Sequence, residues 1–361
     1  MSIVVRILSL GWVMMMIMSI TNVADADISS NLLENIAEIN EEGPYLGIVV
    51  PKTFELDPLL RSSNFLPHAT IPQLDYAGRR FRVGTLENRK VIAVVSGNSM
   101  LNSGLATQLL LSLFKIEGVL HFGVAGNVNP QIKIGDVTIP QYWAHTGLWN
   151  WQRYGDRPGD ALAFESTGDY TRNYGYLNFA KYKVGRLNGK VSDVWYPDNY
   201  LNNVWYQPEE IYSIDGEPEN RQHIFWVPVN KHYYRLARKL EDIVLEQCAN
   251  SATCLPQTPK VVTVRRGVSA NVLVDNAAYR DFLYSKFKAA PVDMESAAVA
   301  LVCHQQKTPF IVIRAISDLA NGTSFIESSN FSSLAVQNAV KVAVKFITLS
   351  LNEMLTLDAA Q

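Results

Sequence analysis

Runs of hydrophobic residues alternate with amphipathic segments along much of the chain. The run 45–50 is uninterrupted and is closed by Pro51, which is typical of a strand buried on both faces. Before it, apolar residues recur at helical spacing over 28–42, which predicts a short amphipathic helix. The same alternation of strand and helix continues toward the C-terminus.

Further strands and helices follow from the same patterns. Two strands over 80–86 and 91–96 are joined by the polar residues 87–90, as in a hairpin. The other predicted strands cover 118–122, 137–140, 261–265 and 310–315. The other predicted helices cover 101–115, 230–247, 276–288, 296–305 and 330–355. This order implies an α/β fold in which a mostly parallel sheet is covered by helices on both faces.

The stretch from about 146 to 227 has a different character. It is rich in Tyr, Trp, Asn, Gly and Asp and has no long hydrophobic period. Ordinary disordered segments contain few aromatic residues. We therefore predict an ordered, loop-rich insertion within a single domain that extends from residue 27 to residue 361.

The N-terminal residues 1–26 have the pattern of a secretory signal peptide. Arg6 precedes an apolar core over 7–20, and Ala24-Asp25-Ala26 offers small residues for cleavage. The apolar run is shorter than the roughly 20 residues that a membrane-spanning helix needs. We expect a secreted or vacuolar protein with no membrane contact after cleavage, and an uncleaved anchor is the alternative.

Sequons and cysteines suit this secretory route. Asn321 and Asn330 begin N-glycosylation sequons. Cys248 and Cys254 flank a small polar loop and are predicted to form a short disulfide. Cys303 lies in an apolar stretch, which is typical of a buried thiol.

Composition and charge argue against several classes of function. The net charge is −2 and the lysines and arginines are scattered, whereas nucleic-acid binding needs a concentrated basic surface. No Gly-x-Ser-x-Gly motif of serine hydrolases is present. Three cysteines without paired spacing argue against zinc, and we expect neither a metal nor a cofactor.

Polar residues follow several predicted strands. Ligands of such sheets bind beyond the carboxyl ends of the strands. The residues at these ends are Glu55, Ser96, a glycine turn over 123–126, Glu295, and Ser317-Asp318. Singly, each has an ordinary structural alternative, such as a tight turn, a helix-dipole partner or a cap. Together they predict one crevice lined by three acids.

Two segments carry a family resemblance. The segments 292–298 (VDMESAA) and 309–318 (PFIVIRAISD) resemble the nucleosidases that cleave methylthioadenosine and S-adenosylhomocysteine, which belong to the nucleoside phosphorylase superfamily. Within it, the signal peptide, the aromatic insertion and the paired cysteines most resemble plant bark and vegetative storage proteins. The resemblance implies a three-layer α/β/α fold with a central mixed, mostly parallel twisted sheet. It also implies a homo-oligomer.

The resemblance assigns roles in cleaving the N-glycosidic bond of a purine nucleoside or thionucleoside. Asp318 matches the general acid near purine N7, provided that burial keeps a proton on it, and Glu55 matches the acid that activates the attacking water. Glu295 matches the ligand of the ribose hydroxyls. The other expected substrate contacts are Met294 beneath the sugar, Ser96, Ala125, Gly126, Leu273, Val274 and Ser317.

One departure from the family concerns the purine base. The nucleosidases place an aromatic ring against the purine in the segment matching 269–275, where this chain has Val272-Leu273-Val274. Affinity or base preference is therefore open. The insertion could supply a replacement ring such as Trp149 or Trp151, cover the pocket, or alter assembly.

The loop after the first strand favours hydrolysis over phosphorolysis. A phosphate co-substrate needs cationic donors, usually arginine, whereas 51–55 contains no arginine and includes a carboxylate that would repel phosphate. Phosphate stays an alternative because Lys52, Arg61 or Arg82 could be recruited. The non-enzymatic alternatives are a storage protein with little activity and a sensor that binds a nucleoside without cleaving it.

Overall fold

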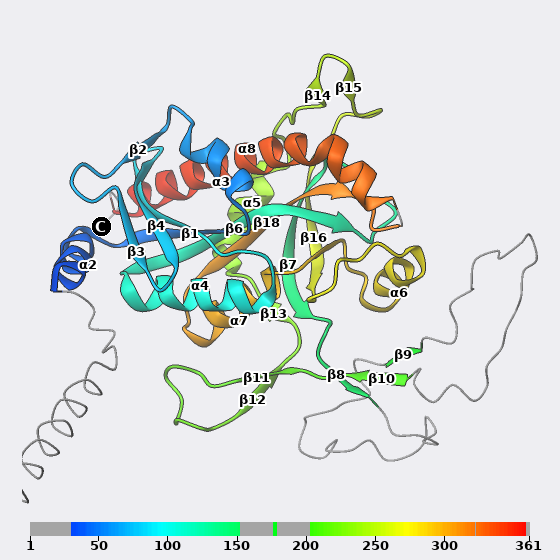
Figure 1. Cartoon of the computed structure of the whole chain (residues 1–361), viewed down its shortest axis with the longest axis horizontal. Coiled ribbons are helices and arrows are strands. Elements are labelled where there is room, and N and C mark those ends of the chain that lie inside the picture. Colours follow the sequence, from blue (N-terminus) through cyan, green and yellow to red (C-terminus); the bar gives the residue numbers. More distant parts are fainter. Residues whose placement is uncertain (1–29, 152–175, 179–202, 322, 359–361) are drawn as a thin grey trace, which may run out of the picture. The chain divides into compact units, whose positions relative to one another are not determined.

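The computed structural model describes residues 30–151, 176–178, 203–321 and 323–358, which fall into two compact units divided between Glu42 and Gly43 (Figure 1). The first unit contributes helix α2 (Ser30–Glu42), within the predicted range. The second unit contains all the other described elements. The predicted signal peptide and much of the predicted insertion lie outside the described residues.

A mixed sheet of 11 strands forms the core of the second unit. Its order is β13-β7-β16-β17-β6-β1-β5-β4-β2, with β18 paired to β6 and β7, and β3 paired to β4. The strands are β1 (Tyr45–Val50), β2 (Phe65–Pro67), β3 (Gln73–Tyr76), β4 (Arg79–Leu86), β5 (Arg89–Val95), β6 (Ile116–Asn127), β7 (Val137–His145), β13 (Val227–Pro228), β16 (Val261–Ser269), β17 (Pro291–Asp293) and β18 (Phe310–Asp318).

Parallel pairing runs through the centre of this sheet. Strand β1 lies between β5 and β6, with Ile48 beside Ala93 on one side and Leu120 on the other. Strand β18 continues the parallel set beyond β6. The edge strands β2, β3 and β4 are antiparallel, as are the pairs β17–β6 and β18–β7. Strand β16 is also parallel to both of its neighbours, β7 and β17. The mixed α/β architecture is as predicted, and hairpins and short strands add the antiparallel pairs.

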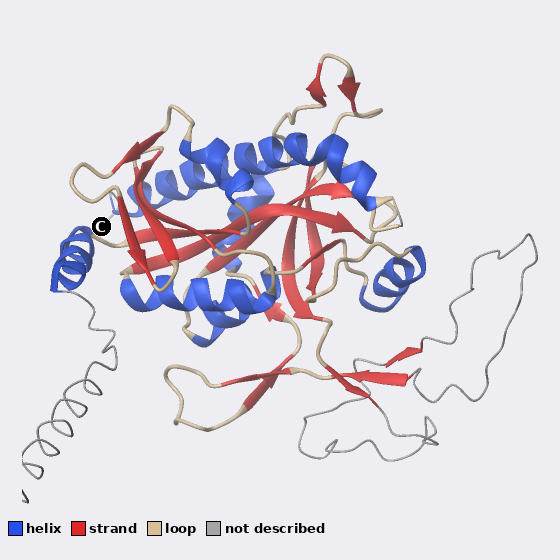
Figure 2. Cartoon of the chain, viewed as in Figure 1, coloured by secondary structure: helices blue, strands red, loops and turns tan. Residues whose placement is uncertain are grey.

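Helices pack on the sheet from both sides. Figure 2 shows α8 on one side and α4 with α7 on the other. The main hydrophobic core lies beneath α8 and includes Leu120, Ile313 and Phe346. The helices of this unit are α3 (Thr53–Leu60), α4 (Met100–Leu113), α5 (Lys231–Ala237), α6 (Ala277–Phe287), α7 (Ser296–Gln305) and α8 (Ser324–Asp358).

Helix α8 contains an unusually apolar stretch. Among the described residues, Ile326–Glu353 is the one helical segment long and apolar enough to cross a membrane. Within its most apolar window, 61% is buried inside the protein. Leu334, Ala339 and Phe346 are fully buried in this helix, so the stretch has the burial of a core helix.

Strands β6 and β18 are longer than predicted. We expected a glycine turn over 123–126, but β6 continues through it to Asn127. The ladder with β18 persists there, with Gly123 beside Arg314 and Ala125 beside Ile316. The prediction of a turn is therefore wrong, because pairing with β18 and β17 keeps the glycine segment extended.

The predicted helix over 230–247 is mostly absent. Helix α5 ends at Ala237 and a short 3₁₀ helix, Arg238–Leu240, follows. The backbone N–H and C=O of Glu246 instead pair with the side-chain amide of Asn338 on α8. Tertiary hydrogen bonds thus replace the helical ones that the local pattern favours.

The described part of the insertion is anchored by aromatic packing. Strands β8 (Trp149–Trp151), β9 (Tyr176–Asn178) and β10 (Asn203–Tyr206) form a small sheet, and β11 (Glu209–Ile211) pairs with β12 (Gln222–Ile224). Tyr206 is fully buried and meets Phe287 edge to face at 5.0 Å. The rings of Phe225 and Phe282 also pack against it. This cluster fixes β10 against α6.

The cysteines and sequons occupy distinct environments. Cys248 and Cys254 form a disulfide that closes the hairpin of β14 (Cys248–Asn250) and β15 (Thr253–Cys254). Cys303 is a buried free thiol on α7, and burial raises its pKa. Asn330 is exposed on α8, whereas Asn321 is half-buried and accepts from the Thr323 hydroxyl at 2.6 Å. Glycosylation of either asparagine stays a prediction.

Candidate active site

A cavity of about 430 Å³ lies at the carboxyl ends of β1, β6 and β18 and at the start of α7. It brings together residues that are far apart in the sequence, as the strand-end rule predicts. The predicted site residues that line it are Glu55, Ala125, Gly126, Leu273, Val274, Met294, Glu295, Ser317 and Asp318.

Ser96 does not line this cavity, although it is one of the predicted substrate contacts. It is fully buried, donates to the Gly97 carbonyl at 3.0 Å and lies 3.1 Å from the Ser103 hydroxyl. Asn98 lines the cavity instead. Because side chains alternate along extended backbone, the strand end alone does not fix which polar residue faces the ligand.

Helix α3 places the Glu55 side chain against the backbone of β6, near the carboxyl end of that strand. The side chain is 1% exposed, and its Oε1 accepts from the Val124 N–H at 2.8 Å. Its Oε2 is buried and has no hydrogen-bond partner in the described structure. Burial raises the pKa of Glu55 to about 7, against the opposing effects of Arg314 and the Val124 N–H. The group is therefore poised to exchange a proton near neutral pH.

Glu295 stands at the N-terminus of α7. Its Oε1 accepts from the Ser99 N–H at 3.1 Å, and its Oε2 faces Arg314 at 3.5 Å. Burial raises the pKa of this carboxyl, and the nearby guanidinium opposes that shift. Its position at the cavity wall leaves it able to accept hydrogen bonds from a ligand with hydroxyl groups.

Asp318 ends β18 next to an irregularity in the ladder with β6, between Ile316 and Asp318. Such irregularities re-aim side chains beside functional sites. The Oδ1 of Asp318 accepts from the Ala320 N–H at 3.0 Å. Its Oδ2 accepts from the hydroxyls of Ser317 at 2.9 Å and Ser328 at 3.3 Å. The carboxyl is thus fixed at the cavity wall by three donors.

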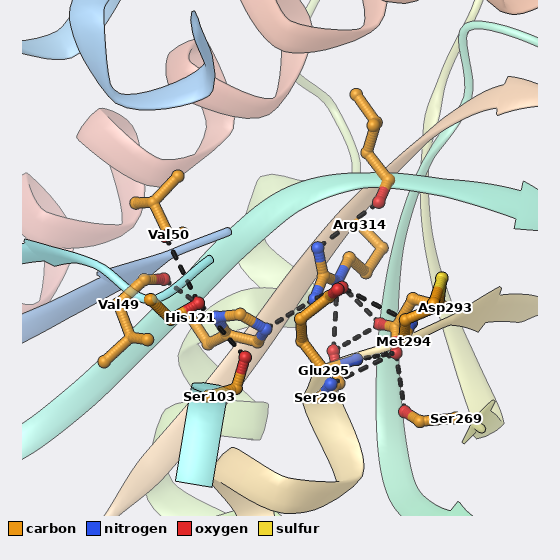
Figure 3. A network of polar contacts seen from close by, with 12 residues as sticks. Val49, Val50, Ser103, His121, Ser269, Asp293, Met294, Glu295, Ser296 and Arg314 are labelled. Atoms are coloured by element: carbon orange, nitrogen blue, oxygen red, sulfur yellow. Dashed lines mark hydrogen bonds and ion pairs between the residues drawn. The ribbon is translucent and has the colours of Figure 1, made fainter. Parts of the chain in front are cut away.

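Arg314 belongs to the site, although the sequence pattern predicts no role for it. It is fully buried in the middle of β18, with its Nε 2.7 Å from Asp293 Oδ2 and its Nη2 facing Glu295 (Figure 3). A buried cation requires such partners. The available signal was a single arginine inside the otherwise apolar segment 310–316.

Asp293 organises the turn that carries Met294 and Glu295. Its Oδ1 accepts from the backbone N–H groups of Glu295 and Ser296, both at 3.1 Å, and from the Ser269 hydroxyl. These bonds satisfy N–H groups at the start of α7 that lack helical partners. Asp293 therefore fixes the direction in which Glu295 leaves the backbone.

The absence of a side chain at Gly123 leaves room for the side chains of Arg314 and Glu55. A Cβ at this position would lie 2.5 Å from Arg314 Nη1 and 2.8 Å from Glu55 Oε1. We expect Gly123→Ala to destabilise the protein by about 1–3 kcal/mol, because a packed site accommodates added volume poorly. Gly104→Ala on α4 is the control, since the nearest atom to its Cβ would be 3.9 Å away. Denaturant unfolding checks this, and equal stabilities of the two variants would contradict the crowding argument.

Phe54 is the aromatic residue that lines the cavity among the described residues. Trp149 instead packs edge to face on Tyr206 at 6.4 Å, and the side chain of Trp151 lies outside the described part. No described residue of the insertion lines the cavity. Leu273 is 74% exposed at its edge, so this wall of the site is aliphatic.

Lys52 is the one lysine or arginine among the described residues that line the cavity. Its Nζ lies 5.6 Å from the centre of the Phe54 ring. Arg61 pairs with Asp57 at 3.0 Å, and Arg82 donates to Gln73. Neither of these arginines reaches the cavity.

Known proteins resemble this chain over most of its length. The model of the phosphorylase superfamily matches residues 45–177 and 184–348. The chain belongs to the phosphorylase superfamily. The predicted family resemblance is thereby confirmed.

Relatives of two kinds match this member of the superfamily. Bark storage protein A of Populus deltoides is 32% identical over 327 residues, which cover 89% of this chain and 95% of that protein. The 5'-methylthioadenosine/S-adenosylhomocysteine nucleosidase of Bacillus velezensis is 24% identical, over 74% of this chain and 84% of that enzyme.

Solved structures show the same fold. The methylthioadenosine/S-adenosylhomocysteine nucleosidase of Colwellia psychrerythraea, in complex with adenine, superposes with a TM-score of 0.56 at 20% identity. The match covers 84% of this chain and 95% of that one.

Proposed function

We propose that this protein hydrolyses the N-glycosidic bond of a purine nucleoside or thionucleoside. The observation that carries the proposal is that Glu55, Glu295 and Asp318 line one cavity while Glu55 Oε2 is buried there without a partner. A carboxylate oxygen left in this state is a candidate base for a water molecule.

The three acids divide the reaction between them. Glu55 takes a proton from water as the water oxygen bonds to C1′ of the sugar. The bond between C1′ and the purine nitrogen breaks, and Asp318, which enters the step as the neutral acid, gives its proton to N7 of the leaving base. Solvent then takes the proton from Glu55 and returns one to Asp318. Glu295 accepts from the sugar hydroxyls and holds C1′ in place. The products are a free purine and a free sugar.

The nature of the substrate rests on the relatives and on the cavity wall. The matching nucleosidases are named for 5'-methylthioadenosine and S-adenosylhomocysteine, and the Colwellia structure holds adenine. In this chain Met294 and Val274 provide apolar surface, and Phe54 provides an aromatic ring. These surfaces suit a flat base attached to a sugar.

Water is favoured over phosphate as the second substrate. A phosphate clamp needs several cationic donors, and Lys52 is the one such group that lines the described cavity. The buried Arg314 is already engaged by Asp293 and Glu295. Phosphorolysis would therefore lack the charge that stabilises a bound phosphate.

Storage is the second candidate function. It is favoured by the likeness to a bark storage protein over 89% of this chain and by the aliphatic segment 272–274 at the base-binding wall. Storage alone makes no use of a buried, unpartnered carboxylate. The arrangement of Glu55 therefore supports the enzyme.

Secretion, glycosylation and homo-oligomer formation belong to the same proposal. The Cys248–Cys254 disulfide supports an oxidising compartment, because disulfides persist along the secretory route. The exposed Asn330 is accessible for modification.

The direct test is release of purine base from adenosine, inosine and methylthioadenosine, with and without phosphate. We expect release without phosphate from at least one of them. Release that requires phosphate would make the protein a phosphorylase and remove the proposed role of Glu55. No release from any of the three would favour storage.

A further inference from the structure

His121 lies in the middle of β6 and is fully buried. Its Nδ1 is 2.8 Å from the carbonyl oxygen of Val49 on β1. A carbonyl only accepts, so Nδ1 carries the proton of the ring. The other nitrogen, Nε2, is then an acceptor, and it faces Nη2 of Arg314 (Figure 3). One imidazole thus connects β1 through β6 to β18.

The ring is neutral for two reasons. Burial lowers the pKa of His121 well below its ordinary value, and the adjacent Arg314 cation acts in the same direction. A neutral acceptor can hold a guanidinium without cancelling its charge. A carboxylate at the same place would hold it equally well but would neutralise it.

The position of Arg314 matters because its positive charge acts on several neighbouring charged groups. Glu55 is faced by Arg314, by Glu295 and by Lys52, the residue that precedes its own helix. Arg314 is also bound by Asp293, on the side away from His121 (Figure 3). A Cβ on Gly123 would be close to both Arg314 Nη1 and Glu55 Oε1, so these two atoms approach the same small space.

We propose that His121 is a positioning residue that holds the Arg314 guanidinium where it acts on both Glu55 and Glu295. This inference rests on the proposed function for its effect on turnover. Its effect on the titration of Glu55 does not depend on that function. The residue touches neither the cavity nor, in the proposed reaction, the substrate.

Loss of the acceptor has a predictable direction. When Nε2 is absent, the neighbouring acceptor for Arg314 Nη2 is Glu295 Oε2, which lies 3.5 Å away in the wild-type structure. We expect the guanidinium to move toward Glu295 and away from Glu55. The pKa of Glu55 then rises further, because an opposing positive charge is withdrawn.

The experiment compares His121→Leu with His121→Gln in the full chain. Glutamine keeps a neutral acceptor, whereas leucine has none. In His121→Leu we expect the acid limb of the pH profile of kcat/KM to move to higher pH by about one unit. Activity below the limb then falls about tenfold. The limb of His121→Gln should stay within a few tenths of a unit, as a rough bound.

A second measurement needs no turnover. The difference in unfolding free energy between the parent and its Glu55→Gln variant depends on pH through the titration of Glu55. We expect this dependence to shift to higher pH in the His121→Leu background and to stay in place in the His121→Gln background. If the wild type is inactive but this shift occurs in the His121→Leu background, the proposed hydrolase is overturned and the role of His121 stays intact.

Two outcomes would overturn the inference. One is a folded His121→Leu protein whose titration of Glu55 is unmoved. The other is an equal shift in both variants, which would assign the effect to packing rather than to the acceptor. If His121→Leu does not fold, His121→Met provides the same test, since its unbranched side chain adapts to irregular space and is a poor acceptor.

Discussion

Asp318→Asn is expected to reduce base release by a factor of about 10²–10⁴, the range over which a positioned general acid contributes. The amide N–H is far too weak an acid to protonate N7, so the purine would have to leave as an anion. The measurement is kcat with each active nucleoside, at a pH where the wild type is at its maximum.

The surroundings of Asp318 make this a clean substitution. Asparagine keeps one oxygen that can accept from the Ala320 N–H. In the wild type the hydroxyls of Ser317 and Ser328 donate to Oδ2. Both hydroxyls can rotate to accept from the amide of the variant. The fold should therefore be retained, which circular dichroism and thermal unfolding can check.

The matched control is Asp281→Asn on α6. Its side chain is 68% exposed and pairs with the neighbouring Arg280 at the surface. We expect unchanged turnover in this variant. Turnover of Asp318→Asn within about threefold of the wild type would show that the leaving group needs no protonation by this residue.

Local patterns were sufficient for the elements whose burial follows a simple period. The uninterrupted apolar run of β1 and the helix α7 lie where the sequence predicts them. The predicted helix over 230–247 failed because Asn338, about ninety residues away, binds the backbone of Glu246. A contact of that sequence separation leaves no trace in a local pattern.

The carboxylates were accessible to sequence reasoning because they lie at strand ends. Their support was not, because it depends on register between β6 and β18. Arg314 pairs with Gly123, which has no side chain, so the guanidinium can reach along β6 to His121. Neither the need for glycine at 123 nor the neutral state of the histidine is visible until the two strands are aligned.

Glu55→Gln is expected to separate activity from stability. Loss of the base should reduce base release by about 10²–10⁴-fold, as for Asp318. In the wild type, kcat/KM should fall as pH drops through about 7, because the base must be unprotonated and the pKa of Glu55 is raised to about 7. That acid limb should vanish from any residual activity of the variant.

The pH-dependent effect of Glu55→Gln on stability favours the variant, whereas its effect on activity is a loss. In the folded state the pKa of Glu55 is about 7, against an ordinary value of 4.5, so the folded protein binds this proton more tightly than the unfolded chain. The wild type therefore loses stability as pH rises from about 4.5 through 7, by about 3 kcal/mol in total. Glutamine carries no charge at any pH and avoids this loss.

The readout is thus the pH dependence of the difference in unfolding free energy between Glu55→Gln and the wild type. A constant offset from the buried amide does not affect that dependence. Relative to its value below pH 4.5, the difference should grow in favour of the variant until about pH 7 and then level off. Glu217→Gln, in the exposed turn between β11 and β12, is the matched control. A flat difference for Glu55→Gln would mean that Glu55 titrates in the folded protein as it does in the unfolded chain. The unpartnered carboxylate would then be an ordinary ionised group, and its assignment as the base would lose its physical support.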